Sequence, residues 1–280
     1  MNTKEQKIIL ITGASSGFGK ATAELLAAKG HIVYGTSRRA QCSSEASQTA
    51  GATTAVHFLQ MDVREPKSIQ HGVLQIMQEQ KHLDVVINNA GMGIGGSVEL
   101  ATEEEIRLQM ETNFMGCVNV CQQVLPIMRK QRRGRIINLS SIGGVMGLPY
   151  QGFYSASKFA IEGFSEALAA EVKGFGISVS MIEPGDFATG FTASRKNSVA
   201  TAESDDYGLS FRRSLALIEK EENGGLKPEV LARKIAQVAV CRHPRLRYCV
   251  ADLEQRFSMF VKKILPGNWF VNILRNYYKV

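Results

Sequence analysis

The chain has 280 residues, a net charge of +7 and an apolar content of 44%, which are ordinary values for a globular protein. At ~100–200 residues per domain, this length fits one large domain, and the composition excludes a disordered, collagen-like or disulfide-rich chain. The charge is uneven, because residues 241–280 carry +6 and the first 240 residues carry +1. We therefore expect a local basic tail, and no nucleic-acid partner, since no nucleic-acid-reading motif accompanies the charge.

The five cysteines are an odd number without CxxC spacing. This pattern predicts free thiols in a reducing compartment, with neither a disulfide framework nor a metal site. Cys117 and Cys121 lie one helical turn apart and are expected to be small buried side chains. No stretch reaches the ~18 consecutive apolar residues of a membrane span, and the N-terminal apolar run is too short for a signal peptide. We therefore expect a cytoplasmic protein.

Short β-branched apolar runs alternate with stretches of helical periodicity along the chain. Strands are predicted at residues 7–12, 31–36, 55–61, 84–87, 135–139 and 177–182, with a last one near 246–251. Helices are predicted at residues 20–29, 102–130, 154–173 and 228–241. The alternation predicts a Rossmann-type three-layer αβα sandwich, formed by residues 1–280 as a single domain around a parallel, doubly wound sheet of roughly seven strands.

Two regions depart from this alternation. Residues 187–225 are polar and follow the carboxyl end of a strand, where open α/β sheets bind ligands. They are interpreted as a partly helical substrate lid, with a plain surface insertion as the alternative. Residues 252–280 form a basic amphipathic extension with apolar residues at helical spacing. Three interpretations stay open for this extension: a helix lying on an anionic membrane, a cover over the substrate pocket or a neighbouring subunit, and simple packing on the core.

A glycine-rich loop, TGASSGFG at residues 12–19, separates the first strand from the first helix. Gly13 permits a tight turn, Gly17 lets the backbone approach a pyrophosphate, and Gly19 lets the helix pack close to the strand. The helix N-terminus then offers free N–H groups and the positive end of its dipole to the phosphates. The spacing is G-xxx-G-x-G and not the G-x-G-xx-G form. The prediction of a dinucleotide-binding loop therefore depends largely on the strand before the loop and the helix after it.

The end of the second strand indicates which dinucleotide is bound. NAD sites place an acidic residue there for the ribose 2′-hydroxyl, whereas an arginine accommodates the 2′-phosphate of NADP. The run GTSRR at residues 35–39 has no acid, Ser37 leaves room, and the Arg38 guanidinium can bind a phosphate with two parallel hydrogen bonds. NADP(H) is therefore predicted over NAD(H). Arg39 is as readily explained as a solvated charge.

Tyr154 and Lys158 stand one helical turn apart on the same helix face. A phenol with a pKa near 10 is a poor acid–base catalyst at neutral pH, and a nearby ammonium is expected to lower that pKa. Upstream, Ser141 closes the fifth predicted strand, where its hydroxyl can hold a substrate oxygen. Asn113 lies inside a predicted helix, where asparagine is mildly unfavourable, which suggests a water-binding role or a local kink.

These motifs resemble, in order, those of the classical short-chain dehydrogenases/reductases. The resemblance covers roughly residues 7–191 and rests on TGASSGFG, NNAG at 88–91, Asn113, IINLSS at 136–141, YSASK at 154–158, and Pro184-Gly185 with Thr189. Residues 136–191 also resemble the hydroxysteroid and retinol dehydrogenase branch, which handles lipophilic alcohols and ketones.

The resemblance implies a role for each catalytic residue. Tyr154 is the general acid for carbonyl reduction, Lys158 lowers its pKa and binds the nicotinamide ribose, Ser141 orients the carbonyl oxygen, and Asn113 holds a water of a proton relay. It also implies that Asp62 contacts adenine. The residues expected to line the cofactor are Gly13, Ser15, Gly17, Phe18, Gly19, Ser37, Arg38, Asp62, Val63, Asn89, Ala90, Gly91, Tyr154, Lys158, Pro184, Gly185 and Thr189.

An apolar substrate pocket is predicted, although several of its residues could instead pack the lid. Its expected lining is Gly144, Leu148, Pro149, Tyr150, Phe153 and Phe191. The predicted function is NADP(H)-dependent interconversion of a carbonyl and an alcohol on a hydrophobic substrate such as a steroid, retinoid or lipid-like ketone or aldehyde. The alternative is a dinucleotide-sensing regulator without turnover. The resemblance further suggests a homodimer or homotetramer through the helices at 102–130 and 154–173.

Overall fold

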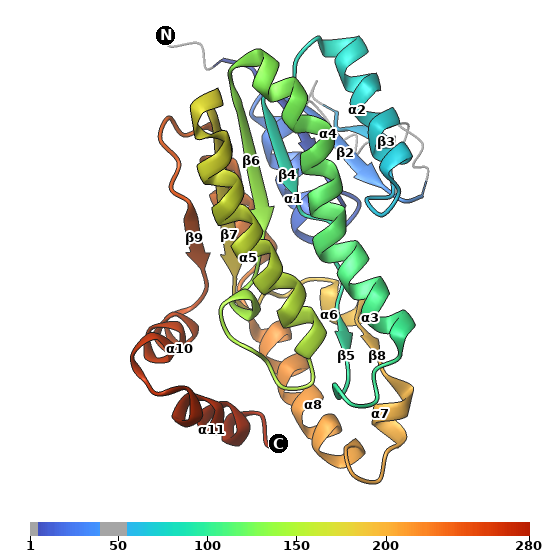
Figure 1. Ribbon diagram of the computed structural model, residues 1–280, viewed down its shortest axis with the longest axis vertical. Helices are drawn as coiled ribbons and strands as arrows, with labels where there is room; N and C mark the ends of the chain where they lie inside the picture. Colours follow the sequence, from blue (N-terminus) through green and yellow to red (C-terminus); the bar gives the residue numbers. More distant parts are fainter. Residues whose placement is uncertain (1–4, 40–54) are drawn as a thin grey trace.

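A seven-stranded parallel sheet runs through the molecule (Figure 1), and the computed structural model describes residues 5–39 and 55–280. Its strands are β1 (Ile8–Ile11), β2 (Ile32–Ser37), β3 (His57–Gln60), β4 (Val85–Asn88), β6 (Gly134–Leu139), β7 (Ile177–Pro184) and β9 (Arg247–Val250). Their order, β3-β2-β1-β4-β6-β7-β9, places the switch in winding direction between β1 and β4. The predicted Rossmann-type architecture is confirmed, and a strand forms in every segment where one was predicted.

Helices cover both faces of the sheet. One face carries α1 (Gly17–Ala28) and α9 (Pro228–Val240), and the other carries α2 (Pro66–Gln80), α4 (Gly116–Gln131) and α5 (Gly152–Val172). The central strand β1 is apolar at every position because it is buried on both sides, with Ile9 packing toward α1 and Leu10 toward α2 and α4. This double burial explains the continuous apolar runs of the sequence.

The helix predicted over residues 102–130 consists of three consecutive segments. They are α3 (Glu103–Met110), a π-helical stretch (Glu111–Met115) and α4. The Thr102 hydroxyl accepts a hydrogen bond from the Glu105 backbone N–H (3.2 Å), and the Glu105 carboxylate accepts one from the Thr102 N–H (2.9 Å). Asn113 lies in the π-helical stretch, so the helix is irregular at the residue that the sequence marked as unfavourable there.

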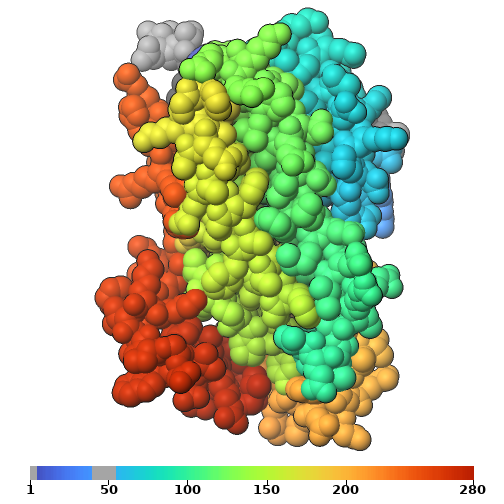
Figure 2. Space-filling model, viewed as in Figure 1, coloured from blue at the N-terminus to red at the C-terminus, as the bar shows by residue number. Residues whose placement is uncertain are grey.

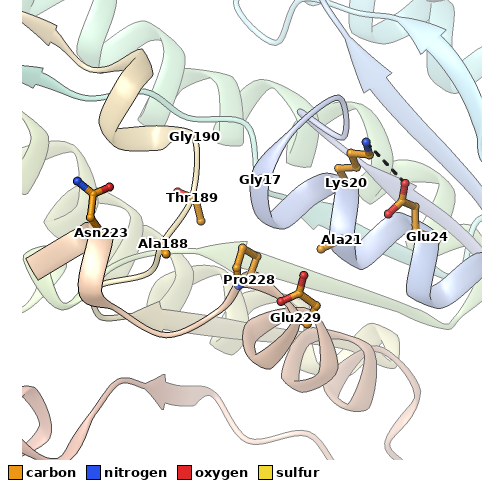
Figure 3. Close-up of a pocket in the computed structure, with 10 residues that line it drawn as sticks. All are labelled: Gly17, Lys20, Ala21, Glu24, Ala188, Thr189, Gly190, Asn223, Pro228 and Glu229. Atoms are coloured by element: carbon orange, nitrogen blue, oxygen red, sulfur yellow. Dashed lines mark ion pairs between the residues drawn. The ribbon is translucent and has the colours of Figure 1, made fainter. Parts of the chain in front are cut away.

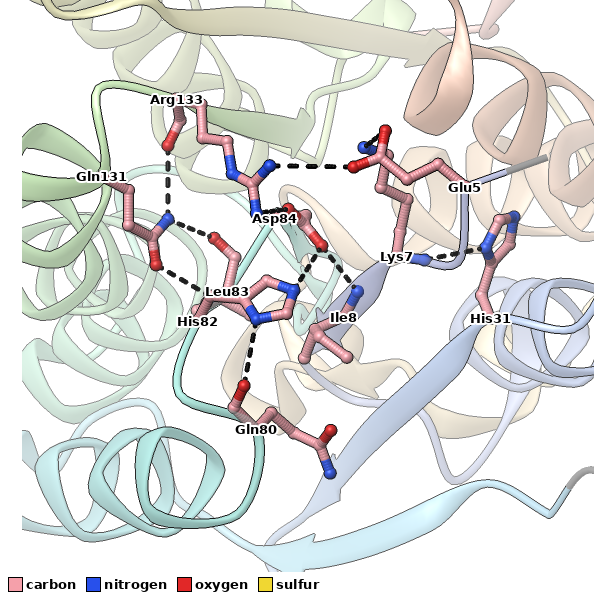
Figure 4. Close-up of polar contacts among 10 residues, drawn as sticks. All are labelled: Glu5, Lys7, Ile8, His31, Gln80, His82, Leu83, Asp84, Gln131 and Arg133. Atoms are coloured by element: carbon pink, nitrogen blue, oxygen red, sulfur yellow. Dashed lines mark hydrogen bonds and ion pairs between the residues drawn. The ribbon is translucent and has the colours of Figure 1, made fainter. Parts of the chain in front are cut away.

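A polar network joins the amino ends of three strands (Figure 4). The buried Asp84 carboxylate accepts a hydrogen bond from the Ile8 backbone N–H (2.9 Å) and lies 3.6 Å from the Arg133 guanidinium and 3.3 Å from His82. The Gln131 side chain bonds both the N–H and the carbonyl of the residue before Asp84. These contacts fix the starts of β1, β4 and β6, at the edge opposite to the strand ends that carry the predicted site.

Residues 187–225, named here the insertion, lie beyond the carboxyl ends of the strands (Figure 1). They contain α6 (Phe191–Ser194), the short strand β8 (Lys196–Asn197), α7 (Val199–Glu203) and α8 (Gly208–Gly224). Strand β8 pairs with β5 (Ile94–Gly95), which follows the NNAG motif. The insertion is therefore partly helical, as expected, and is attached to the loop after β4.

Residues 252–280, named here the tail, contain α10 (Leu253–Ile264) and α11 (Gly267–Tyr277). Figure 2 shows the tail as a lobe beside α5. Its inner face packs on the loop after β6, where Phe270 is buried against Ile142 and Met146. The Lys262 ammonium donates to the carbonyl of Val145 and lies 5.0 Å from the ring centroid of Phe159 on α5. The tail thus packs on the body of the protein through one of its two faces.

Four of the five cysteines lie in the described part of the chain, and all four are free thiols. Cys117 and Cys121 are buried in the core on α4, as predicted, whereas Cys42 lies outside the described residues. Within residues 5–39 and 55–280, no helix has the length and apolar character needed to cross a membrane.

Arg247 on β9 is surrounded by three carboxylates. Its guanidinium lies 2.9 Å from Glu162, 3.4 Å from Glu183 and 2.5 Å from Glu166. Glu162 and Glu183 are buried, so one cation faces more negative charge than it neutralises. Burial, followed by repulsion from Glu162, raises the pKa of Glu183 to about 7. In the folded state this carboxyl group is therefore protonated, and uncharged, below about pH 7.

Replacing Glu183 by glutamine tests whether the raised pKa of this carboxyl group makes the stability of the protein depend on pH. Because the folded pKa lies above the unfolded value, the stability associated with Glu183 is present below pH ~4.5 and is lost as pH rises through about 7. The unfolding free energy of Glu183→Gln minus that of the wild type should increase by roughly 2–3 kcal/mol between pH 5 and pH 8, measured by urea denaturation. Glu166→Gln, which removes the exposed carboxylate that pairs with the same arginine, is the control. A difference that is the same at both pH values contradicts the assignment.

Candidate active site

The glycine-rich loop connects β1 to α1 and lies against the end of β4. A Cβ on Gly13 would lie 2.9 Å from the Ala90 Cα, and a Cβ on Gly19 would lie 2.3 Å from the Gly13 carbonyl oxygen. Gly17 has open space around it, but its φ of +52° belongs to the left-handed region. Space therefore requires glycine at positions 13 and 19, and backbone conformation favours it at position 17.

Asn89 ties this loop to the end of β4. Its side-chain amide donates to the carbonyls of Thr12 (2.8 Å) and Gly13 (3.0 Å). The Thr12 hydroxyl accepts from the backbone N–H groups of Asn89 and Ala90, both at 3.0 Å. Gly91 comes next, and a Cβ on it would lie 3.4 Å from the Asn113 side-chain oxygen. Residues 89–91 thus pack under the glycine-rich loop and hold it through their backbone N–H groups and the Asn89 side-chain amide.

The N-terminus of α1 opens into a cleft of about 450 Å³ (Figure 3). The Ser16 side chain makes no capping hydrogen bond there, so within residues 5–39 and 55–280 the first N–H groups of the helix have no side-chain cap. A helix N-terminus in this state suits a phosphate. The cleft is lined by Gly17, Lys20, Ala21, Glu24, Ala188, Thr189, Gly190, Asn223, Pro228 and Glu229. It therefore brings together Gly17 and Thr189, which were both predicted to contact the cofactor.

Two more predicted residues lie on the open side of the loop. Ser15 is exposed, and the half-buried Phe18 ring packs edge-on against Phe187, with 5.1 Å between the ring centroids. The Phe187 contact links the first turn of α1 to the start of the insertion, across the top of the sheet.

Arg38 extends into solvent at the end of β2, next to the half-buried Ser37. Its backbone carbonyl accepts a hydrogen bond from the Gln60 side chain at 3.2 Å. Among the described residues, none forms a hydrogen bond or ion pair with the Arg38 guanidinium. The donors of Arg38 are therefore available to an anion at the position predicted for the 2′-phosphate.

Asp62 is already engaged by a residue that the sequence did not single out. The Arg64 guanidinium forms two parallel bonds with its carboxylate, with Nε 3.1 Å from Oδ1 and Nη2 2.7 Å from Oδ2. This pair holds the pKa of Asp62 below its usual value. The neighbouring Val63 is buried against Gly116, and its carbonyl accepts from Asn119 at 3.2 Å. The Asp-x-Arg spacing after β3 was the available signal for Arg64.

Ser141, Tyr154 and Lys158 come together at the carboxyl ends of β6 and β7. The Ser141 hydroxyl accepts a hydrogen bond from the Gly143 N–H at 3.0 Å and faces the Tyr154 phenol oxygen as a donor. The Lys158 ammonium donates to the Leu139 carbonyl at 2.8 Å and lies 5.8 Å from the centroid of the Tyr154 ring. The structure thus places the predicted acid, its serine partner and the lysine side by side.

Burial dominates the acid–base properties of this group. It raises the pKa of Tyr154 to about 12, although the Ser141 hydrogen bond opposes the shift. Burial also lowers the pKa of Lys158 to about 8, against the opposing charges of Cys117 and Glu162. The expected lowering of the tyrosine pKa by the ammonium is therefore not seen, because the ammonium is directed to the Leu139 carbonyl and desolvation is the larger effect. The phenol is held in the neutral form, which is the form that can donate a proton.

Asn113 connects the π-helical stretch to α5. Its side-chain amide donates to the Met92 carbonyl (3.0 Å) and the Ser157 hydroxyl (3.1 Å), and its oxygen accepts from the Met92 N–H (2.8 Å). The Ser157 hydroxyl in turn donates to the Tyr154 carbonyl at 2.7 Å. Asn113 therefore fixes the backbone of the catalytic helix, and its predicted water-holding role stays a prediction.

The predicted substrate residues differ in where they point. The Phe191 ring lies 5.9 Å from the Tyr154 ring, and Leu148 packs with the tail residues around Phe270. Tyr150 has a φ of +56° and packs on Phe211 of α8 at 5.3 Å between centroids. These residues lie around the catalytic group or join it to the insertion.

Two of the predicted pocket residues serve other contacts. A Cβ on Gly144 would lie 2.5 Å from the Ser140 hydroxyl and 3.1 Å from the Lys158 carbonyl, so Gly144 allows a close approach to α5. The half-buried Phe153 borders a small depression beside Gly95 and Gly96. Periodicity alone could not separate these packing positions from wall positions.

The tail also reaches the end of β7. Gln255 on α10 accepts a hydrogen bond from the Asp186 N–H at 3.2 Å and donates to the Asp186 carboxylate. A Cβ on Gly185 would lie 1.9 Å from the Gln255 oxygen, so the Pro184–Gly185 turn is covered on one side by α10.

Comparison with known proteins agrees with this arrangement. Residues 7–200 match the family model described as short chain dehydrogenase. The chain is 54% identical over 276 residues to a 3-ketodihydrosphingosine reductase of Bacteroides thetaiotaomicron, covering 99% of each chain. It is 32% identical over 255 residues to an NADPH-dependent 3-dehydrocapnine reductase of Ornithobacterium rhinotracheale, covering 89% of each.

A solved structure supports the same conclusion. A short-chain dehydrogenase from Streptomyces avermitilis superposes with a TM-score of 0.80 at 29% identity, over 98% of this chain and 97% of that one. The chain therefore belongs to the short-chain dehydrogenase/reductase family, as an oxidoreductase that binds a nicotinamide dinucleotide.

Proposed function

We propose that the protein reduces the ketone group of a hydrophobic, lipid-like substrate with NADPH. The observation that carries this proposal is the Tyr154 phenol, which burial keeps neutral and which is hydrogen-bonded to Ser141 below the ring of Phe191. A neutral phenol beside a second hydroxyl can bind a carbonyl oxygen and then protonate it. The name of the Bacteroides relative, a 3-ketodihydrosphingosine reductase, supports a ketone as substrate.

The protein's own groups supply binding and proton transfer. The nicotinamide, when bound, supplies the hydride. The hydroxyl groups of Ser141 and Tyr154 donate hydrogen bonds to the carbonyl oxygen, and these bonds strengthen as negative charge develops on that oxygen. Tyr154 transfers its proton to the alkoxide, and the positive charge of Lys158 stabilises the phenolate that is left. Asn113 keeps α5, and with it Tyr154, in position through Ser157.

A dinucleotide-sensing regulator without turnover is the competing function. Such a protein needs the cofactor cleft but has no use for a proton donor beside a carbonyl-binding hydroxyl. The contact between Tyr154 and Ser141 therefore favours an enzyme. A carbonyl substrate that is consumed together with NADPH distinguishes the two functions.

The preference for NADPH rests on the end of β2. The Arg38 guanidinium is exposed, and no acidic residue occurs at residues 35–39. An acid at this place would repel the 2′-phosphate, whereas a guanidinium binds it. The Ornithobacterium relative is named as NADPH-dependent, which supports the same preference.

The outer face of the tail supports a site on a membrane surface. Large apolar side chains are exposed there, with Leu253 80%, Phe257 65%, Phe260 57%, Ile264 63% and Trp269 66% exposed. Basic residues lie among them, namely Arg256, Lys263, Arg275 and Lys279. Apolar residues interleaved with cations are typical of helices that lie in the interface of an anionic bilayer. We infer that the tail holds the protein, as a cytoplasmic enzyme, on such a surface.

The inner face of the same tail supports access to a lipid-like substrate. It packs on Ile142, Met146 and Leu148, in the loop that follows Ser141. A substrate that leaves the bilayer beside the tail would reach the catalytic group along this apolar loop. The tail accordingly serves both as a membrane contact and as one wall of the substrate path.

The outer faces of the long helices support a homodimer or homotetramer. Met115 and Phe159 are each 42% exposed, on the π-helical stretch before α4 and on α5. Apolar side chains on long neighbouring helices are suited to a symmetric contact with a second copy.

Replacing Tyr154 by phenylalanine removes the proton donor and keeps the ring. We expect kcat for carbonyl reduction to fall about 10²–10⁴-fold, because that is the usual contribution of a positioned general acid. NADPH affinity, measured by fluorescence titration, should stay within about threefold, since the cofactor cleft is unchanged. Tyr248→Phe on β9 is the control and should keep full activity. Activity of Tyr154→Phe within tenfold of the wild type contradicts the role.

Replacing Arg38 by alanine removes the proposed phosphate contact. The dissociation constant for NADPH should rise about 10- to 100-fold, which corresponds to the loss of charged hydrogen bonds, while that for NADH stays within about threefold. Arg39→Ala is the matched control at the next position. An unchanged NADPH affinity, or a wild-type protein that binds NADH more tightly, contradicts the preference.

The membrane contact is tested with the triple variant Phe257→Ser, Phe260→Ser, Trp269→Ser in the full chain. The wild type should sediment with vesicles containing phosphatidylglycerol, and less with phosphatidylcholine alone or at high salt. The triple variant should bind at least about tenfold more weakly, because each ring removed takes apolar area out of the interface. Leu74→Ser, an exposed apolar residue on α2, is the control. Equal sedimentation of wild type and triple variant contradicts the contact.

A further inference from the structure

A buried arginine lies in the insertion close to the catalytic group. The Arg195 side chain is only 2% exposed, and its Nη2 donates to the Glu222 carboxylate on α8. Its Nε and Nη1 are also buried, and within the described chain neither has a hydrogen-bond partner. Buried donors without partners are costly and rare in folded proteins, so two on one guanidinium indicate an acceptor that binds there.

The Phe191 ring lies close to both the Arg195 guanidinium and Tyr154, the proposed proton donor. Its central carbon lies 5.8 Å from the centroid of the Phe191 ring, and that ring lies 5.9 Å from the Tyr154 ring. The methylene groups of Arg195 run along β5, where the absence of side chains at Gly93 and Gly95 leaves them room. Arg195 therefore lies near the catalytic group on the side of the insertion, with the Phe191 ring in contact with both.

Glu222 holds the guanidinium in a fixed orientation. One of its carboxylate oxygens accepts from Arg195, and the other accepts from the Thr192 hydroxyl at 2.6 Å. Each oxygen thus accepts one hydrogen bond, and these bonds hold the Glu222 carboxylate and the Nη2 group of Arg195 in place. A charged donor fixed in this way is prepared to bind an acceptor without further rearrangement.

The surrounding charge selects the kind of acceptor. Three further carboxyl groups, those of Asp186, Glu221 and Asp252, interact with one another near this pair. Burial, with Glu221 and Glu222 contributing, raises the pKa of Asp186 to about 7. A second anion would be repelled from such a region, whereas an uncharged oxygen would gain the charged hydrogen bonds without that repulsion.

We propose that Arg195 binds a hydroxyl oxygen of the substrate close to the reacting carbonyl, so that the substrates are hydrophobic hydroxyketones. This inference rests on the proposed carbonyl reduction and adds the polar group beside the ketone. The hydrocarbon part of such a substrate would lie toward the apolar loop at Ile142–Leu148, and the hydroxyl toward the insertion.

Three substrates of equal chain length test the proposal on the wild-type enzyme: a 1-hydroxyalkan-2-one, the alkan-2-one without the hydroxyl, and the 2-oxoalkanoate anion. NADPH oxidation gives kcat/KM for each. The hydroxyketone should be preferred over the plain ketone about 10- to 100-fold, the range expected for hydrogen bonds to a charged donor. The oxoalkanoate should be the poorest of the three.

The variant Arg195→Met removes the donors and keeps most of the volume. It should lose the preference by lowering kcat/KM for the hydroxyketone about 10- to 100-fold while changing the plain ketone less than about threefold. Because this variant leaves Glu222 without its cation, Arg195→Met/Glu222→Gln is made beside it and should show the same loss of preference. Arg213→Met, at an exposed position of α8, is the matched control and should keep the wild-type preference.

Equal kcat/KM of the wild type for hydroxyketone and plain ketone overturns the proposal, as does a preference for the oxoalkanoate. An equal loss for both ketones in the two Arg195 variants also overturns it, because that result indicates a purely structural role. A wild-type enzyme that oxidises no NADPH with any ketone, including long-chain keto lipids, contradicts the proposed function itself, so the two failures are distinguishable.

Discussion

The site depends on the close approach of the glycine-rich loop to the end of β4. Gly13 and Gly19 have no room for a side chain, and the Asn89 amide bonds two successive loop carbonyls. Because parallel strands end at one edge of the sheet, this contact aligns the start of α1 with the ends of β4, β6 and β7. The N-terminus of α1 and the hydroxyls of Ser141 and Tyr154, which we propose to bind the phosphates and the carbonyl oxygen, are therefore positioned by the same packing, on opposite sides of the switch between β1 and β4.

Desolvation acts in opposite directions on the two titrating catalytic residues. It disfavours the charged form of each, raising the pKa of Tyr154 and lowering that of Lys158. For the carbonyl reduction proposed above this is useful, because that reaction would begin from a protonated phenol and would need the ammonium only once the phenolate forms. The same low-dielectric surroundings make the hydroxyl pair of Tyr154 and Ser141 a stronger electrostatic partner for a developing alkoxide than it would be in water.

The sequence predicted what depends on local pattern. Buried strands, and the tight glycine turn between β1 and α1, follow from hydrophobic periodicity and backbone sterics, and the structure contains them. Contacts between distant segments could not be predicted. Gln255 covers Gly185, and Gly144 lies against α5, because the folded chain brings these distant residues together. The direction of the Tyr154 pKa shift likewise depends on burial, which spacing does not report.

The tail contacts two loops that border the candidate site. Gln255 contacts the turn after β7, while Phe270 packs on the loop after Ser141. Thermodynamic linkage makes such an arrangement reciprocal: any ligand that favours one position of the tail is itself bound more tightly when the tail is held there by something else. A surface that fixes α10 and α11 would act as an effector of this enzyme, and the affinity of the catalytic site would depend on where in the cell the protein resides.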